Sequence, residues 1–149
     1  MERAVSKKPR VALVAHDHSK PALLSLARDH ESTLKELDLV ATQHTGELLA
    51  RHTGLTSVRL VASGPLGGDL VLASEIVKGR IHALIFLCDT TQTHPHQSDI
   101  KALLRVATLY NIPLATNPAT ATLLLSSDML KPATHLEKPR RIREASPLH

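Results

Sequence analysis

The sequence is poor in aromatic residues: its 149 residues include one Phe, one Tyr and no Trp. The hydrophobic core is therefore expected to consist of aliphatic side chains, chiefly those of Leu, Val, Ile and Ala. The scarcity also argues against single-stranded nucleic-acid binding, which depends on aromatic side chains that stack on the bases. We expect no nucleic-acid partner.

Cysteine and long apolar runs are equally scarce. The single cysteine, Cys88, cannot form a disulfide within the chain and fits a reducing compartment. No stretch approaches the roughly 18 consecutive apolar residues that a membrane-spanning helix requires. We expect a cytoplasmic protein with no membrane partner, in which Cys88, within the apolar run 85–88, is a buried and unreactive thiol.

Several motifs of nucleotide and hydrolase sites are absent as well. There is no Gly-x-Gly-x-x-Gly after the first apolar run, no Walker loop and no Gly-x-Ser-x-Gly elbow. Histidines and aspartates gather at 16–18 and 89–99, and these residue types bind zinc, but their spacing matches no common zinc pattern. A metal-dependent hydrolase is therefore the less favoured alternative to acid–base chemistry.

The charged residues that are present give a net charge of +4 at pH 7, with the positive charges concentrated near the two ends. Such a surface attracts anions without specifying one, and it favours a small phosphorylated molecule. The hydrophobic content of 42% and charged content of 21% are those of a globular protein. We expect one domain at 10–130, a basic segment at 1–9 and a basic, Pro-containing tail at 131–149.

Short aliphatic runs alternate with longer amphipathic stretches, which predicts a parallel sheet covered by helices on both faces. The predicted strands span Arg10–Ala15, Leu37–Ala41, Ser57–Ala62, Ala83–Cys88 and Ile112–Ala115. The predicted helices span Pro21–Lys35, Gly46–His52, Asp69–Lys78, Ser98–Tyr110 and Pro118–Ser126. Pro113 indicates that the last strand lies at an edge. The fold class is therefore α/β, a three-layer α/β/α sandwich with a five-stranded parallel sheet.

Nearly all polar side chains that could do chemistry follow the carboxyl end of a predicted strand. They occupy segments 16–20, 42–46, 63–69, 89–99 and 116–117, whereas the links that precede the strands are chemically plainer. Open α/β sheets bind their ligands just beyond the carboxyl ends of the strands. We therefore expect the active site at this edge of the sheet.

Two of these segments suit an anionic ligand. The Gly-rich segment 63–69 leads into a helix and can point backbone N–H groups at a ligand oxygen, or it can simply be a tight turn with Asp69 as helix cap. Segment 42–46 offers hydroxyl and N–H groups at another helix start, or is an ordinary capped loop. Lys20 supplies a positive charge suited to phosphate, or is solvated.

The segments that carry these residues resemble the methylglyoxal synthase family. The resemblance rests on Ala-His-Asp-His-x-Lys at 15–20, Ala-Thr-x-x-Thr-Gly at 41–46, Ser-Gly-Pro-Leu-Gly-Gly-Asp at 63–69, Pro-His-x-x-Asp at 95–99 and Pro-Leu-Ala-Thr-Asn at 113–117. It implies a homohexamer that needs no metal or organic cofactor. It also implies conversion of dihydroxyacetone (glycerone) phosphate, through an enediolate, to methylglyoxal and inorganic phosphate.

The resemblance further implies roles for individual residues. Asp69 is implied as the base that removes a proton beside the carbonyl, with His96 polarising the substrate oxygens and Asp99 as a supporting carboxylate. The backbone N–H of Gly64 is implied to bind the developing enediolate charge. The implied substrate-binding residues are His16, Asp17, Lys20, Thr42, Gln43, His44, Thr45, Ser63 and Gly64.

The segment 42–46 departs from the usual Thr-Gly-Thr-Thr-Gly of the family. Gln43 stands in place of a glycine and disfavours a positive φ, and His44 stands in place of a hydroxyl. These changes leave a second interpretation open: a non-catalytic module of the same fold that senses phosphorylated metabolites. The presence of Asp69, His96 and Asp99 together favours the enzyme.

Overall fold

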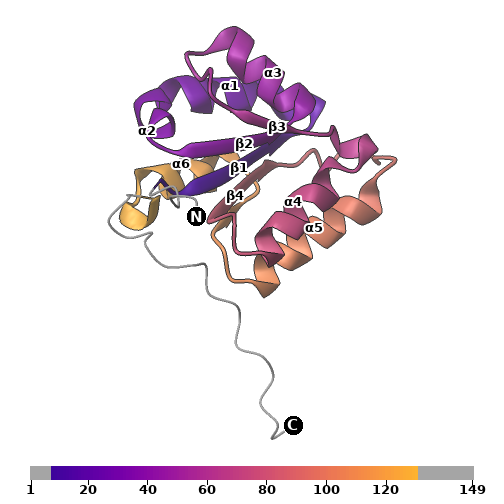
Figure 1. The fold of residues 1–149 in the computed structure, drawn as a ribbon. Helices are drawn as coiled ribbons and strands as arrows, with labels where there is room; N and C mark the ends of the chain where they lie inside the picture. Colours follow the sequence, from indigo (N-terminus) through magenta and orange to yellow (C-terminus); the bar gives the residue numbers. More distant parts are fainter. Residues whose placement is uncertain (1–7, 131–149) are drawn as a thin grey trace, which may run out of the picture.

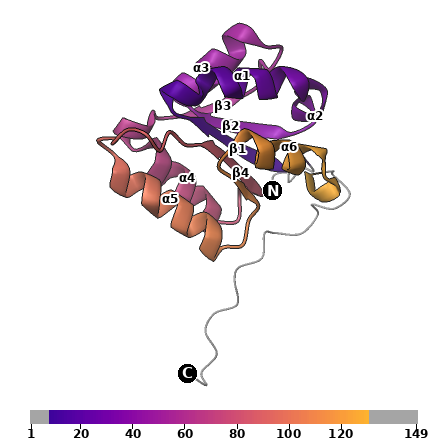
Figure 2. The same ribbon diagram turned by 180° about the vertical axis from the view of Figure 1, so that it is seen from behind.

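The computed structural model describes residues 8–130. Most of the basic segment expected at 1–9 and all of the tail expected at 131–149 lie outside the described residues. Within them, five parallel strands form one sheet in the order β3-β2-β1-β4-β5. Helices cover both faces of this sheet (Figures 1 and 2), so the predicted three-layer α/β/α architecture is confirmed.

The structure contains every predicted strand and helix. The strands are β1 (Arg10–Ala15), β2 (Asp38–Thr42), β3 (Arg59–Val61), β4 (Ala83–Leu87) and β5 (Leu114–Ala115). The helices are α1 (Lys20–Asp29), α2 (Glu31–Lys35), α3 (Gln43–His52), α4 (Gly68–Val77), α5 (Gln97–Leu109) and α6 (Pro118–Ser126). Three short 3₁₀ turns are η1 (Asp17–Ser19), η2 (Gly64–Leu66) and η3 (Asp128–Leu130).

The largest differences from the predicted boundaries are in two helices; the ends of the other helices and strands lie within two residues of the prediction. The helix predicted over Pro21–Lys35 is broken into α1 and α2, because His30 adopts a non-helical conformation with φ −120° and ψ 24°. The helix predicted to begin at Gly46 begins at Gln43 instead. Thr42 ends β2 in an extended conformation and is at the same time the N-cap of α3, so no loop separates the strand from the helix.

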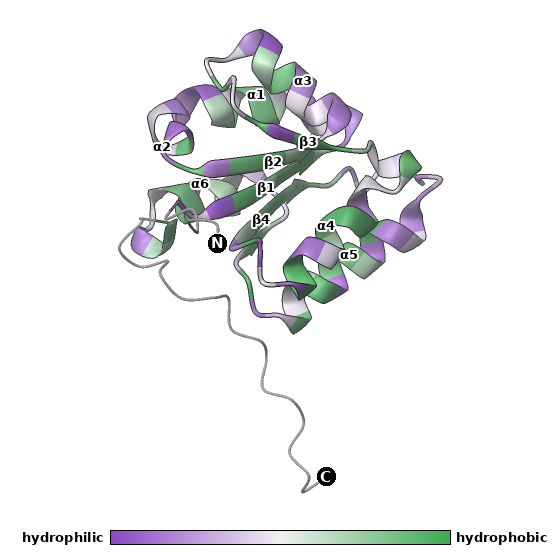
Figure 3. Ribbon diagram, in the orientation of Figure 1, coloured by the Kyte–Doolittle hydropathy of each residue, from purple (hydrophilic) through white to green (hydrophobic). Residues whose placement is uncertain are grey.

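The sheet separates two apolar clusters. Side chains that alternate along the strands pack against α1, α2, α3 and α6 on one face and against α4 and α5 on the other. Phe86 lies fully buried in the second cluster. Both faces being covered explains why the strands are almost continuously hydrophobic in Figure 3.

The strand order places β1 at the centre of the sheet. The chain continues from β1 through β2 to β3 on one side, and then crosses to β4 and β5 on the other. The point at which an open sheet reverses its strand order leaves a crevice beyond the carboxyl ends of the strands. As Pro113 predicted, β5 lies at an edge. Within residues 8–130, none of the helices is both long and apolar enough to cross a membrane.

The close approach of α4 to the end of β3 yields a prediction. A Cβ at Gly68 would lie 1.8 Å from the carbonyl oxygen of Ala62, and backbone cannot move aside as a flexible side chain can. We expect Gly68→Ala to lower the free energy of unfolding by about 3 kcal/mol or more, the upper range for overpacking. Urea denaturation measures the change.

Gly54→Ala is the matched control. Its Cβ would meet Glu31 Oε1 at 2.8 Å and Lys35 Nζ at 3.2 Å, both at the ends of flexible side chains. We expect a loss below about 1 kcal/mol, as for most surface substitutions. Equal denaturation midpoints for the two variants would contradict the packing argument.

Candidate active site

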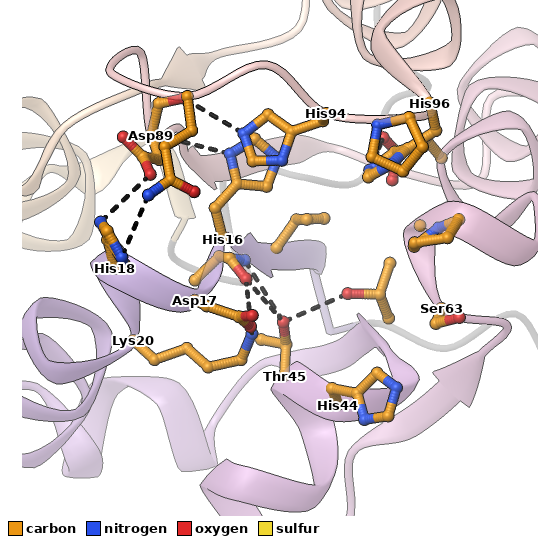
Figure 4. Close-up of a pocket in the computed structure, with 18 residues that line it drawn as sticks. His16, Asp17, His18, Lys20, His44, Thr45, Ser63, Asp89, His94 and His96 are labelled. Atoms are coloured by element: carbon orange, nitrogen blue, oxygen red, sulfur yellow. Dashed lines mark hydrogen bonds and ion pairs between the residues drawn. The ribbon is translucent and has the colours of Figure 1, made fainter.

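A pocket of about 400 Å³ lies at the carboxyl ends of the strands, between the segments that follow β1, β2, β3 and β4 (Figure 4). Its position at the crevice beside β1 agrees with the expectation from the distribution of polar residues. The predicted site residues that line it are His16, Asp17, Lys20, Thr42, His44, Thr45, Ser63, Gly64, Asp69 and His96. The structure thus brings together residues from four separate segments of the chain.

Two predicted site residues do not line this pocket. Gln43 is exposed, and its amide donates a hydrogen bond of 3.1 Å to Glu47 Oε1 within α3. Asp99 lies in the first turn of α5, where its backbone N–H donates to the carbonyl of His96 at 3.0 Å. Its carboxylate is close enough to raise the pKa of Asp69 through repulsion. Asp99 therefore influences the pKa of Asp69 from outside the pocket lining.

The pocket also contains side chains to which the sequence assigned no substrate role. They are His18, Asp89, Gln92 and His94. Three of them were noted only as members of a possible metal cluster. Their position after β1 and β4, the two central strands, is the signal that could have identified them. Among residues 8–130 no group of three or more His, Cys, Asp or Glu side chains is arranged to hold a metal ion.

Asp69 is the most deeply buried ionisable residue of the pocket. It lies in the first turn of α4 with 0% of its surface exposed. Neither carboxylate oxygen has a hydrogen-bond partner within the described chain. Burial therefore raises the pKa of Asp69, the neighbouring Asp99 raises it further, and His96 and His94 act in the opposite direction. An unpaired buried carboxylate is costly, and such groups concentrate at functional sites.

His96 lies beside Asp69 and packs over Gly64. Its Nε2 is 3.8 Å from Asp69 Oδ2. A Cβ at Gly64 would lie only 2.6 Å from the same Nε2, so the absence of a side chain at Gly64 makes room for the ring. Gly64 begins η2, and the first N–H groups of a helical turn have no acceptor within that turn. The carboxylate, the imidazole and a free backbone N–H therefore meet at one point.

His16 presents a second imidazole to the pocket. Its Nδ1 accepts a 2.8 Å hydrogen bond from the backbone N–H of Asp89, which ties the end of β1 to the segment after β4. Burial, followed by repulsion from His94 and His96, lowers the pKa of His16 to about 4. The ring is therefore neutral at pH 7, and because Nδ1 accepts, its proton is carried by Nε2.

The start of α3 and Lys20 form the polar floor of the pocket. The hydroxyl of Thr42 donates to Thr45 Oγ1 at 3.2 Å, and Lys20 Nζ contacts the carbonyl of Ala15 at 3.2 Å and Asp17 Oδ1 at 2.6 Å. The bond and charge of Lys20 lower the pKa of Asp17. Hydroxyl groups, an ammonium group and the N-terminus of a ten-residue helix together suit a phosphate.

Cys88 follows β4 but takes no part in the pocket lining. It is partly exposed, not fully buried as expected from the sequence. Desolvation, together with the charge of Asp69, raises the pKa of its thiol to about 11. The thiol therefore stays protonated at neutral pH, which agrees with the expected lack of reactivity.

Known proteins share this sequence and this architecture. The family model for the MGS-like domain matches residues 22–116. A methylglyoxal synthase of Photorhabdus laumondii is 44% identical over 137 residues, which are 92% of this chain and 90% of that protein. A methylglyoxal synthase of Vibrio parahaemolyticus is 42% identical over the same length, again 92% of this chain and 90% of that protein.

A solved structure gives the same result for the fold. The crystal structure of methylglyoxal synthase from Elizabethkingia anophelis superposes with a TM-score of 0.77 at 40% sequence identity, covering 86% of this chain and 84% of that one. The resemblance noted in the five sequence segments is thus confirmed over most of the chain. The chain belongs to the methylglyoxal synthase family.

Proposed function

We propose that this protein is a methylglyoxal synthase, a lyase that converts dihydroxyacetone phosphate to methylglyoxal and inorganic phosphate without a metal or organic cofactor. The observation that carries the proposal is the carboxylate of Asp69. It is fully buried, lacks a hydrogen-bond partner in the described chain and faces His96 inside the pocket. The names of the relatives support the same reaction.

In this proposal Asp69 removes a proton from the carbon beside the substrate carbonyl. An aspartate in water, with a pKa near 3.9, is a weak base for a C–H bond. Burial raises the pKa of Asp69 and so increases its affinity for a proton. Catalytic bases work best when their pKa approaches the working pH, so the shift acts in the useful direction.

The electron pair released by proton removal moves onto the carbonyl oxygen and forms an enediolate. His96, the N–H of Gly64 and the Nε2–H of His16 are placed to donate hydrogen bonds to the substrate oxygens. Fixed donors of this kind stabilise a developing oxyanion by roughly 3–4 kcal/mol each. His16 suits this role because its lowered pKa keeps the ring neutral, so that Nε2–H donates a hydrogen bond while the ring carries no charge.

The second step breaks the C–O bond to phosphate. The terminal hydroxyl of the enediolate loses its proton and becomes the aldehyde carbonyl, the C=C pair shifts to the carbon that bears phosphate, and phosphate leaves with the C–O pair. The resulting enolate takes up a proton on its terminal CH2 carbon to give methylglyoxal. The C–O bond must stand perpendicular to the enediolate plane for this overlap. Lys20, His44 and Thr45 line the pocket opposite His94 and His96 (Figure 4). We assign the orientation of the phosphate to these three residues and to Thr42, which also lines the pocket.

Gln43, which stands where the family usually has glycine, does not disturb the phosphate-binding residues proposed at the start of α3. Gln43 is the first residue of α3, and among residues 8–130 the one non-glycine residue with a positive φ is Asn111. The backbone conformation that a glutamine disfavours is therefore not required there. The side chain bonds to Glu47 outside the pocket. This observation favours the enzyme over the non-catalytic sensor.

A homohexamer and a cytoplasmic location belong to the same proposal. Supporting association, exposed apolar side chains lie on α4 and η2, namely Leu66, Leu70, Val71 and Val77, and Figure 3 shows α4 as strongly hydrophobic. The cytoplasmic location stays a prediction from the single cysteine.

Sedimentation equilibrium tests the assembly. We expect the protein to sediment at six times the mass of one chain, because the family resemblance implies a homohexamer. The exposed apolar side chains of α4 are the candidate interface, since such patches mark sites of protein association. Leu70→Lys, which places a charge in the patch, is expected to lower the mass. A wild-type protein that sediments as a monomer contradicts the proposal.

The decisive test of the function is turnover. Purified, chelator-treated protein is expected to release methylglyoxal and one equivalent of phosphate from dihydroxyacetone phosphate, with inhibition by added phosphate at the shared anion site. Asp69→Asn, which keeps the size of the side chain but cannot accept the proton, is expected to lower kcat by about 10³-fold or more. Methylglyoxal captured as its hemithioacetal gives the rate.

Either of two experimental outcomes would contradict this proposal and favour another function. Wild-type protein that binds the substrate without releasing methylglyoxal indicates the sensing module. Activity that disappears with chelator and returns with zinc indicates the metal-dependent hydrolase.

The burial of Asp69 also predicts a pH-dependent stability. Because its folded-state pKa is raised, the protonated carboxyl is favoured in the fold, and stability is lost as pH rises from the ordinary carboxyl value through the folded value. Asp69→Asn removes this loss. We expect the variant to melt above wild type at pH 8, by about 2–4 °C for each kcal/mol recovered.

Thermal unfolding between about pH 4 and pH 8 measures the difference, which is expected to shrink toward the ordinary carboxyl pKa of about 3.9. Glu47→Gln is the control, because it removes an exposed carboxylate of α3 outside the pocket. A lower melting temperature for Asp69→Asn at pH 8 would show that the carboxylate is satisfied in the folded protein.

A further inference from the structure

The pocket contains two imidazoles, those of His18 and His94, for which the proposed reaction has no use. His94, in the segment between β4 and α5, stacks on His16 with ring centroids 3.9 Å apart and an interplanar angle of 29°. Its Nε2 lies 3.3 Å from the carbonyl oxygen of Asp89, the residue whose N–H bonds to His16. Figure 4 shows the two rings over one another at the roof of the pocket, with His96 to one side.

His16 needs more than its hydrogen bond to hold a fixed orientation. The bond from Asp89 N–H fixes the direction of Nδ1, but the ring plane can still turn unless groups lie against its faces. Phe86 meets the ring edge-on, with centroids 5.1 Å apart and planes at 77°. His94 is therefore the stacked group that covers a face of the ring, whereas Phe86 and His96 meet it edge-on.

The orientation matters because of the opposite nitrogen. Nε2 of His16 is buried and has no hydrogen-bond partner among the described residues. A neutral donor left unsatisfied inside a ligand pocket is available to an oxygen of the ligand. A small rotation of the ring would move this N–H away from that oxygen, and misplacement by about 1 Å can cost a hundredfold in rate.

We propose that His94 is a positioning residue, whose stacked ring holds His16 so that the Nε2–H points at a substrate oxygen. The proposal rests on the function proposed above, but it concerns the geometry of His16 and can be measured without turnover. In this role His94 fixes the orientation of the His16 ring and takes part in neither proton transfer nor phosphate binding.

The charges around His16 agree with this role. The segment after β4 contributes His94, His96 and Asp89, and α1 contributes Lys20; from α4, Asp69 acts on His94 and His96. Burial is the largest cause of the lowered pKa of His16, and His94 is the next largest. Removal of the His94 ring exposes His16 and removes a repulsion, so both effects raise the pKa of His16.

Two substitutions separate stacking from imidazole chemistry. His94→Phe keeps an aromatic ring against His16, whereas His94→Ala removes it. Thr93→Ala is the control for the segment, because Thr93 is exposed and does not line the pocket. Thermal unfolding of all three variants establishes that they are folded before the other measurements are made.

Nitrogen-15 NMR of the histidine rings gives the direct readout, with the His16 signals assigned by their loss in His16→Gln. In the wild-type protein we expect a neutral Nε2–H tautomer down to about pH 5, since the pKa of His16 is about 4. In His94→Phe, which keeps a covering ring but removes the repulsion from His94, we expect the same tautomer, with protonation at a pH between those of wild type and His94→Ala. In His94→Ala we expect His16 to become protonated at a higher pH and to lose its single tautomer.

Kinetics gives the second readout. We expect His94→Ala to lower kcat about 10- to 100-fold with KM changed less than about threefold, because the phosphate contacts remain. His94→Phe is expected to retain kcat within about threefold of wild type.

Unchanged His16 titration and unchanged kcat in His94→Ala would overturn the proposal. So would a loss of kcat in His94→Phe as large as that in His94→Ala, since it would show that the imidazole itself is required. If wild-type protein has no synthase activity, the proposed function fails, while the NMR comparison still decides whether His94 orients His16.

Discussion

The contact between the buried carboxylate of Asp69 and the ring of His96, at 3.8 Å, is the interaction on which the pocket is organised. This contact depends on the position at which α4 begins, immediately after Gly67. Gly67, with φ 95°, turns the chain in a conformation that residues with a side chain rarely adopt, and Gly68 lies against the carbonyl of Ala62. Gly64 leaves room for the ring. Backbone constraints at three glycines therefore hold a charged group in a position that costs folding energy.

The second constraint is the pairing of β1 with β4. This pairing brings His16, which follows β1, beside Asp89 and His94, which follow β4. Proton removal is assigned to the side of the pocket formed by α4 and the start of α5, and phosphate binding to the start of α3. Both regions lie at the carboxyl ends of the strands, on the same edge of the sheet.

Much of this organisation could be predicted from the sequence, because strands buried on both faces leave continuous aliphatic runs and the polar residues follow them. The directions of individual side chains could not. Gln43, the first residue of α3, bonds to Glu47 outside the pocket, and Asp99, in the first turn of α5, does not line the pocket. The stacking of His94 on His16 depends on which strands are neighbours. The pattern of aliphatic residues predicts where strands lie in the sequence, but not their order in the sheet.

The lengths of the strands follow their positions in the sheet. The two edge strands, β3 and β5, have three and two residues, whereas the central strand β1 has six. Short edges offer few unpaired backbone groups on which another chain could add a strand. Pro113, immediately before β5, has no N–H to donate and further shortens the ladder that this edge could extend. The sheet thus resists fibrillar edge-to-edge growth.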